Sequence, residues 1–248
     1  MSLHVTVLGC SGIYATAERA CSGYLVEFGD TRLWLDAGAG SWQNLMKHID
    51  YQSLTGVLLS HRHPDHVTDV FQAYHSRYWG EPGRLPPIPL WAPAELIERI
   101  YSFSSDSAEA FDLHEIDEET AIEVEDARFT FTRMAHPPVT LGVRIERNDA
   151  VFAYSADTGE AADFDRLARE ADYFVCEATH HDSDPSWEGH LRASQAGEVA
   201  AKVNAQRLIL THIPPGRDLD RSLAEAKATS GDVHVGIAYD GMSIEVGA

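Results

Sequence analysis

The sequence predicts an α/β protein in which short strands alternate with helices along the whole chain. Apolar runs of strand length end at glycine or aspartate, and amphipathic segments of helical length lie between them. No internal repeat, low-complexity segment or flexible linker separates residues 1–120 from 121–248, and both parts hold strands and helices. Because 248 residues suffice to bury a large core, we expect one domain over residues 1–248.

In the first half, apolar runs bounded by turn residues predict strands, and Gly29-Asp30 predicts a hairpin turn between the second and the third. Strands are expected at residues 3–8, 23–28, 32–35 and 56–60. Helices are expected at 67–78 and at 93–101, the second beginning at a proline. Residues 80–89 are rich in Gly and Pro and predict a loop. The acidic stretches 104–109 and 112–119 predict a solvated face or a lid.

In the second half, strands and helices are interleaved more evenly. Strands are expected at residues 122–134, 141–146, 151–154, 173–176, 208–210, 233–238 and 243–246. Helices are expected at residues 162–170, 193–203 and 219–229. This order fits a four-layer αββα sandwich, with two mixed sheets face to face and helices outside, although periodicity alone does not give that packing.

The charge balance excludes some classes of function. The net charge is −20, and only three of the 19 basic residues are lysines, so most of the surface repels polyanions. The basic footprint of a protein that grips long nucleic acid is missing. No apolar run approaches the roughly 20 residues of a membrane span, and residues 1–9 lack the pattern of a signal peptide. We therefore expect a cytoplasmic protein without membrane contact.

The three cysteines do not indicate a structural site. Cys10, Cys21 and Cys176 are widely spaced, and no C-x-x-C pair occurs. Neither a disulfide framework nor a thiolate zinc site is predicted.

The central feature is a cluster of three imidazoles and a carboxylate directly after the strand expected at 56–60. In extended chain, residues i and i+2 point to the same side, so His61 and His63 can bind one metal ion. Pro64 then turns the chain, and Asp65 and His66 can point at a second ion. Imidazole nitrogen with carboxylate oxygen suits zinc, and also manganese or iron.

One cluster cannot complete two ion sites, because each ion takes four or more ligands and a catalytic ion keeps a position for water. Three candidates for the missing ligands follow expected strands elsewhere in the chain. They are His136, Asp157 and His212. Singly, each is more often a cap or a surface group, but together with the cluster they predict a two-metal centre.

These motifs, with Asp36 in Leu35-Asp36-Ala37-Gly38, resemble the metallo-β-lactamase fold superfamily across nearly the whole chain. The resemblance implies the following roles. One ion would be held by His61, His63 and His136, the other by Asp65, His66 and His212, and Asp157 would bridge both beside a bridging hydroxide. Asp36 would orient the cluster. The family usually has glycine before the bridging aspartate, where this chain has Ala156, which puts the local backbone geometry in question.

Further motifs resemble the ribonuclease Z branch of that superfamily. Glu177-Ala178-Thr179 follows a strand, Gly189-His190-Leu191 precedes a helix, and the chain ends near Tyr239-Asp240-Gly241. The resemblance implies that His190, held by Glu177, protonates the leaving oxygen of a phosphodiester. It also assigns Asp65 to the catalytic set, and relatives in the branch suggest a homodimer.

The resemblance to ribonuclease Z does not extend to the substrate. A tRNA-processing member would carry a long basic arm between His136 and Asp157, but only 20 residues lie there. A small phosphodiester is therefore the expected substrate, and the Ala135-His136-Pro137 and Thr211-His212-Ile213 segments resemble bacterial members that hydrolyse cyclic nucleotides.

Three alternatives stay open at this level: a ribonuclease Z-type nuclease that trims tRNA 3′ ends, a lactone or thioester hydrolase, and a non-catalytic metal-binding protein. Arginines 62, 192 and 217 are candidate phosphate contacts. His180 and the other histidines without a motif are interpreted as surface or packing residues.

Overall fold

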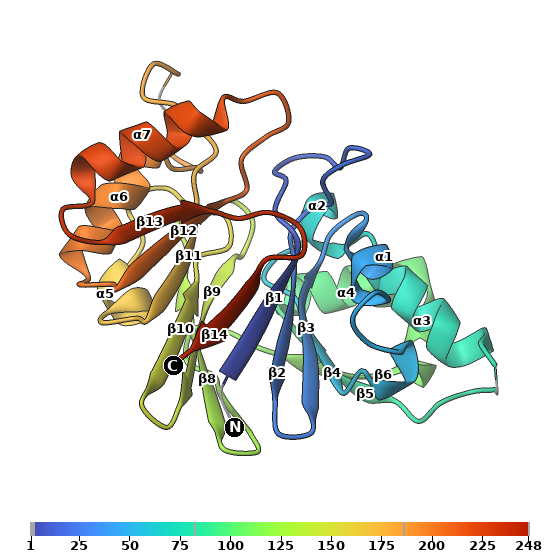
Figure 1. The fold of residues 1–248 in the computed structure, drawn as a ribbon. Helices are drawn as coiled ribbons and strands as arrows, with labels where there is room; N and C mark the ends of the chain where they lie inside the picture. Colours follow the sequence, from blue (N-terminus) through green and yellow to red (C-terminus); the bar gives the residue numbers. More distant parts are fainter. Residues whose placement is uncertain (1–2, 82, 186, 248) are drawn as a thin grey trace.

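The computed structural model describes residues 3–247 except 82 and 186. In this part of the chain the strands form two seven-stranded sheets that lie face to face, and helices cover the outer face of each sheet (Figure 1). The expected four-layer αββα arrangement of two mixed sheets is confirmed.

The first sheet is built mostly from the N-terminal half, in the order β14-β1-β2-β3-β4-β5-β6. Its strands are β1 (Leu3–Gly9), β2 (Gly23–Phe28), β3 (Thr31–Ala37), β4 (Gly56–Leu58), β5 (Ile88–Ala92), β6 (Phe111–Glu115) and β14 (Ser243–Val246). Pairing is antiparallel from β14 to β3 and parallel from β3 to β6. The last strand of the chain therefore completes the sheet begun by the first.

The second sheet has the order β13-β12-β11-β10-β9-β8-β7. Its strands are β7 (Ala121–Val124), β8 (Ala127–Arg133), β9 (Leu141–Arg147), β10 (Ala150–Tyr154), β11 (Tyr173–Glu177), β12 (Arg207–Thr211) and β13 (His234–Ile237). Here too an antiparallel part, β7 to β10, continues into a parallel part, β10 to β13. Parallel strands end at the same edge of a sheet, so their C-terminal loops gather there.

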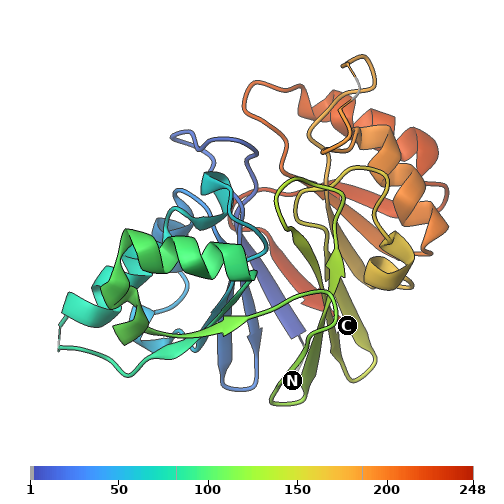
Figure 2. The same cartoon turned by 180° about the vertical axis from the view of Figure 1, so that it is seen from behind.

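The helices flank the sheets on opposite outer faces, as the two views show (Figures 1 and 2). The first sheet carries α1 (Ser41–Leu45), α2 (Pro64–Val67), α3 (Val70–Trp79) and α4 (Ala94–Phe103), and the second carries α5 (Phe164–Ala168), α6 (Ala193–Lys202) and α7 (Leu219–Thr229). Short 3₁₀ turns occur at Tyr51–Ser53 and Ser105–Glu109. Among the described residues, every helix is too short or too polar to cross a bilayer.

The largest apolar core lies between the two sheets. Tyr24 on β2 packs against Tyr154 on β10 with ring centroids 4.8 Å apart, and Phe28 packs against Phe129 at 6.3 Å. One further apolar core lies between each sheet and its own helices. In the core of the first sheet, Trp34 packs against Trp42. Burial on both faces explains why the central strands are nearly continuous apolar runs.

Two expected elements are wrong in detail. The strand expected at 122–134 is a hairpin of β7 and β8, whose turn contains Glu125 with φ +50°. That turn lacks the Gly, Asn or Pro that marks most hairpins. The helix expected at 67–78 is interrupted between α2 and α3, because the Asp69 amide donates to the Ala37 carbonyl outside the helix. The Asp69 carboxylate fixes this position by accepting from the Gly40 and Trp42 amides.

The acidic stretches 104–109 and 112–119 were expected to form a solvated face or a lid, and most of their side chains are exposed, as on a solvated face. Residues 105–109 form a 3₁₀ turn, and β6 adds a parallel edge strand beside β5, which itself begins inside the expected loop. The exposed polar residues of this edge strand, Asp112, His114 and Glu115, hid its strand character, because they kept contact with water. Helix α1 and the turn at Tyr51–Ser53 were not expected.

Candidate metal centre

The sequence cluster lies where β4 ends and α2 begins. The chain stays extended through His63, which has φ −69° and ψ 145°, and Pro64 is the first residue of α2. His61 and His66 are buried completely, and Asp65 is 11 % exposed. Proline suits the first helical position because its missing amide would have had no partner there. The turn thus brings His66 back towards His61, with ring centroids 4.2 Å apart.

The three distant residues come to the same place from the second sheet. His136 follows β8, Asp157 follows β10 and His212 follows β12, and all three are at most 6 % exposed. The structure therefore brings together all seven residues that the sequence singles out, from strands of both sheets.

The first group of possible ligands contains His61, His63, His136 and Asp157, whose ligand atoms all lie within 4.8 Å of one another. The Nε2 atoms of His61 and His136 lie 3.6 and 3.8 Å from Asp157 Oδ2. His63 turns its Nδ1 towards His136 Nε2 at 3.1 Å. Three imidazole nitrogens and one carboxylate oxygen thus converge on one point.

The second group contains Asp65, His66 and His212. Here the other oxygen of the shared carboxylate takes part, because Asp157 Oδ1 lies 3.2 Å from His66 Nε2 and 3.3 Å from His212 Nε2. Asp65 Oδ2 lies 3.2 Å from His212 Nε2. The two oxygens of Asp157 therefore face two different groups, which is the geometry of a carboxylate between two cations.

The donor set fits metal ions on two counts. Tetrahedral bonds of about 2.1 Å separate neighbouring ligand atoms by about 3.4 Å, close to the distances found here. In addition, His61 Nε2, His66 Nε2 and Asp157 Oδ1 are buried and lack a hydrogen-bond partner among the described residues. Buried polar atoms rarely stay unpaired unless an ion or a ligand satisfies them.

The outer nitrogen of each Nε2-facing histidine is fixed by an oxygen of the protein. Asp36 Oδ2 lies 2.7 Å from His66 Nδ1, the Ser60 hydroxyl 3.0 Å from His61 Nδ1, and the Thr179 hydroxyl 3.0 Å from His212 Nδ1. The Gly189 carbonyl accepts from His136 Nδ1 at 2.8 Å. Such partners set the tautomer and the ring orientation of a metal ligand.

Asp36 lies behind the cluster, at the end of β3, and is completely buried. Its carboxylate also accepts from the Ser60 amide and hydroxyl and from the Tyr154 hydroxyl, at 2.7, 2.8 and 2.9 Å. It thereby ties β4, α2 and β10 together around His66.

The charges of the cluster perturb one another strongly. Burial lowers the pKa of His61, and the neighbouring His66 lowers it further. Burial alone would also lower the pKa of His66, but the carboxylates of Asp157 and Asp36 raise it well above its usual range. Burial would raise the pKa of Asp157, yet His212 and His66 hold it well below the usual range. The cluster thus favours a carboxylate anion among imidazoles.

Beside this cluster lie His190 and Glu177, the other two residues singled out. His190 Nδ1 lies 2.6 Å from Glu177 Oε1, and its ring stacks on His212 with centroids 5.3 Å apart. Burial would lower the pKa of His190, but the Glu177 carboxylate raises it. His190 also forms a group with Asp157 and His212 in which the ligand atoms lie within 4.8 Å.

Several residues of the site were given no role from the sequence. Thr179 contacts Glu177 and His212, Ser60 contacts Asp36, and the Ile13 amide donates to Asp65 Oδ2 at 2.8 Å. Thr179 and Ser60 lie inside segments already singled out, so adjacency was the available signal. Ile13 has φ +71° in an exposed loop, and nothing in its sequence indicates the contact.

Comparison with known proteins gives the family. A family model described as a beta-lactamase superfamily domain matches residues 31–213. An uncharacterised protein of Mycobacterium tuberculosis is 36 % identical over 94 % of this chain and 89 % of its own length. Ribonuclease Z of Archaeoglobus fulgidus is 25 % identical over 99 % of this chain and 98 % of its own.

A solved structure shows the same fold over almost all of the chain. The probable metallo-hydrolase YhfI of Bacillus subtilis is 27 % identical over 96 % of this chain and 100 % of its own length. Its crystal structure, described as a metallo-beta-lactamase fold protein, matches with a TM-score of 0.91 over 99 % of this chain and 100 % of that one. The chain therefore belongs to the beta-lactamase superfamily, as a metallo-hydrolase with a histidine–aspartate cluster able to bind metal.

Proposed function

We propose that this protein hydrolyses a small phosphodiester, with His190 as the proton donor to the leaving oxygen. The observation that carries the proposal is the 2.6 Å contact between His190 Nδ1 and Glu177 Oε1, directly beside the metal cluster. A cyclic nucleotide is the substrate to test first.

The metal ions are assigned to the two groups described above, with Asp157 between them, and zinc is the first choice. When bound, two such ions polarise a phosphoryl oxygen and lower the pKa of water. The ligands are His61, His63 and His136 for one ion, and Asp65, His66 and His212 for the other. Asp36 and Thr179 hold two of these rings in place.

His190 is placed for proton transfer to a leaving alkoxide. Because Glu177 Oε1 occupies the Nδ1 side of the ring, we assign the transferred proton to Nε2, and a ring nitrogen of His190 lies within 4.8 Å of ligand atoms of Asp157 and His212. The Glu177 carboxylate is itself fixed by the Thr158 amide at 2.7 Å and the Thr179 hydroxyl at 2.7 Å. An alkoxide is a poor leaving group, so a positioned acid contributes about 10²–10⁴ in rate.

Charge and chain length favour a small substrate. The net charge of −20 disfavours a long polyanion. Residues 137–156, where an RNA-binding arm would be inserted, are mostly occupied by β9 and β10. The alternative supported by a specific observation is tRNA 3′ processing, because ribonuclease Z of Archaeoglobus fulgidus matches over nearly its full length.

A panel on metal-analysed protein tests the reaction. The substrates are 3′,5′-cyclic AMP, bis-(p-nitrophenyl) phosphate, a lactone, a thioester and pre-tRNA. We expect two metal ions per chain and turnover of the first two substrates. Cleavage of pre-tRNA to a mature 3′ end, with no hydrolysis of cyclic AMP, would assign the protein to tRNA processing instead. Turnover confined to the lactone or thioester would reject phosphodiester hydrolysis.

His190→Ala separates a proton donor from a metal ligand. We expect the variant to keep both metals and to lose about 10²–10⁴ in kcat. Glu177→Gln keeps an acceptor for His190 but removes the charge, so its loss is expected to be smaller, about 10- to 100-fold. If His190→Ala loses metal, His190 is a ligand and its role as a donor is wrong.

A further inference from the structure

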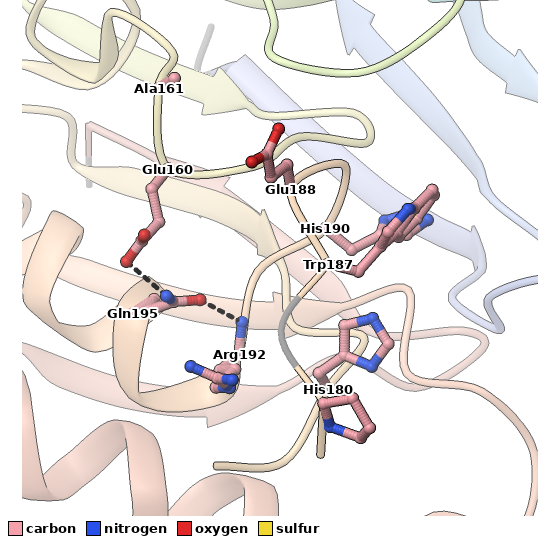
Figure 3. Close-up of a pocket in the computed structure, with 9 residues that line it drawn as sticks. Glu160, Ala161, His180, Trp187, Glu188, His190, Arg192 and Gln195 are labelled. Atoms are coloured by element: carbon pink, nitrogen blue, oxygen red, sulfur yellow. Dashed lines mark hydrogen bonds between the residues drawn. The ribbon is translucent and has the colours of Figure 1, made fainter. Parts of the chain in front are cut away.

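A large aromatic side chain stands beside His190 without a place in any core. The Trp187 indole lies 4.6 Å from the His190 ring between centroids and 6.0 Å from His136, yet it is 50 % exposed. Its indole and the His190 imidazole lie side by side at one end of the pocket drawn in Figure 3. Half of a tryptophan thus faces solvent next to the histidine that would protonate the leaving group.

The loop that carries Trp187 is anchored to the metal cluster. The Gly189 carbonyl accepts from His136 Nδ1 at 2.8 Å. On the other side, the Glu188 backbone packs so closely on Gly159 that any side chain at Gly159 would collide with the Glu188 carbonyl oxygen. Gly159 follows the turn of Asp157, so the positions of Trp187 and of the candidate bridging ligand are coupled through backbone contacts.

The space beside Trp187 is a pocket of about 410 Å³. That volume lies within the range of small-molecule sites. The lining includes Trp187, His190, His180, Arg192, Gln195 and the two acidic residues Glu160 and Glu188. The pocket shares His190 with the candidate metal centre, so a molecule whose scissile bond lies at His190 would extend into it.

The polar groups of the pocket include hydrogen-bond donors and acceptors. Arg192 Nε and His180 Nε2 are buried and have no hydrogen-bond partner among the described residues. The Gln195 amide lies between the Glu160 carboxylate and the Arg192 backbone amide, as the dashed lines in Figure 3 show. The residues that line the pocket with Trp187 thus include both hydrogen-bond donors and acceptors.

This combination disfavours a second phosphate. Glu160 and Glu188 would repel another anion, and Arg192 is the one arginine among the residues that line the pocket. A neutral, planar ring with its own donors and acceptors fits this lining better, because its face can stack on the indole and its edge can form hydrogen bonds with the polar groups of the pocket. Nucleobases have this chemistry.

We propose that this pocket is the subsite for the nucleobase of a nucleoside phosphodiester, and that Trp187 is the stacking wall that selects such substrates. The inference rests on the proposed function for the position of the scissile phosphate at His190. It narrows the substrate class from small phosphodiesters in general to those that carry a base. Trp187 acts in binding, not in the chemical step.

Binding without turnover tests the subsite. Affinities of the metal-loaded protein for adenosine 5′-monophosphate and for ribose 5-phosphate are measured by isothermal titration calorimetry. The two probes share the ribose and the 5′-phosphate, and a hydroxyl replaces the base at the anomeric carbon of ribose 5-phosphate. We expect the monophosphate to bind more tightly in the unmodified protein, and Trp187→Ala to reduce that preference by about 10- to 100-fold. Affinity for ribose 5-phosphate should stay unchanged.

Two further variants control the experiment. Trp187→Phe keeps a stacking face and should keep most of the preference. Trp79→Ala removes another exposed tryptophan, 69 % exposed at the end of α3 and outside the pocket, and should change neither affinity. With cyclic AMP as substrate, Trp187→Ala should raise KM and leave kcat nearly unchanged.

The outcomes separate this inference from the proposed function. Equal affinities for the two probes in the unmodified protein, or a preference that survives Trp187→Ala, would overturn the nucleobase subsite whatever the protein hydrolyses. A preference that depends on Trp187 would support the subsite even if the panel shows no phosphodiester turnover, in which case the proposed reaction alone fails.

Discussion

The metal cluster and the neighbouring pocket wall, formed by Trp187 and Arg192, are built in different ways. In the cluster, Asp157 and the imidazoles facing it are almost fully buried, and the outer nitrogens are held by oxygens such as those of Asp36 and Thr179. In the wall, Trp187 is half exposed, and Arg192 Nε lacks a partner within the described residues. The difference suggests that the metal cluster fixes the geometry of the reaction and that the pocket wall determines which ligand binds.

The strongest way to break the cluster is Asp157→Ala. The change removes the carboxylate that faces both groups and four imidazoles, and it leaves Asp65, which lies beside His212, as the remaining carboxylate among the candidate ligands. We expect metal content below two ions per chain and hydrolysis reduced to the buffer rate, measured by elemental analysis and by the panel above.

The matched control is Asp149→Ala, because Asp149 is exposed in the turn between β9 and β10. It should keep both metals and full activity. Wild-type turnover in Asp157→Ala would overturn the assignment of the bridging ligand, and with it the two-metal centre.

A smaller effect on metal binding is expected from Asp36, which contacts a candidate ligand but is not one itself. In Asp36→Asn the amide oxygen can take the place of Oδ2, which contacts His66, Tyr154 and the Ser60 hydroxyl. The amide nitrogen then takes the place of Oδ1 and faces the Ser60 backbone amide, so that two hydrogen-bond donors oppose each other. The anionic partner that orients the His66 ring and makes it a more basic ligand is also lost. We expect metal affinity to fall about 10- to 100-fold in a competition titration with a chelator.

Asp69→Asn is the control for this change. Asp69 is also a buried carboxylate. Among the described residues its Oδ2 accepts from the Gly40 and Trp42 amides alone, and the amide oxygen of Asn can do the same. Metal affinity should stay unchanged. If both variants lost affinity equally, Asp36 would have a general structural role and no particular one at His66.

The sequence predicts the cluster better than the wall, and the reason is physical. Ligand residues must be His or Asp and must follow strand ends, so position and chemistry coincide in the sequence at His136, Asp157 and His212. The fold order was likewise readable from apolar runs, because buried strands leave few alternatives. The face-to-face packing and the metal roles came from the resemblance to a family, which periodicity does not supply.

The sequence did not reveal the pocket wall, and it misplaced some elements of the fold, for the same reason. Both depend on contacts between residues that are distant in the sequence. Trp187 carries no motif. It lies only three residues before His190, so their contact is partly local, whereas the hydrogen bond from His136 to the Gly189 carbonyl that anchors this loop joins distant residues. The interruption between α2 and α3 depends in the same way on the Asp69 amide reaching back to the Ala37 carbonyl. Such contacts leave no periodic trace in the local sequence.

The smallest effect concerns the backbone that presents the bridging carboxylate. Ala156 has φ +51°, in the left-handed region where glycine is favoured, and the family resemblance predicted glycine at this position. Ala156→Gly removes about 1 kcal/mol of backbone strain, but it gives the unfolded chain about 0.5–1 kcal/mol more entropy. It also removes a methyl group that is 1 % exposed. These opposing terms leave a change in unfolding free energy within about 1 kcal/mol, which urea titration can measure, with metal content and kcat unchanged. A loss of metal in this variant would show that the alanine methyl, and not the backbone turn alone, holds Asp157 between the two groups.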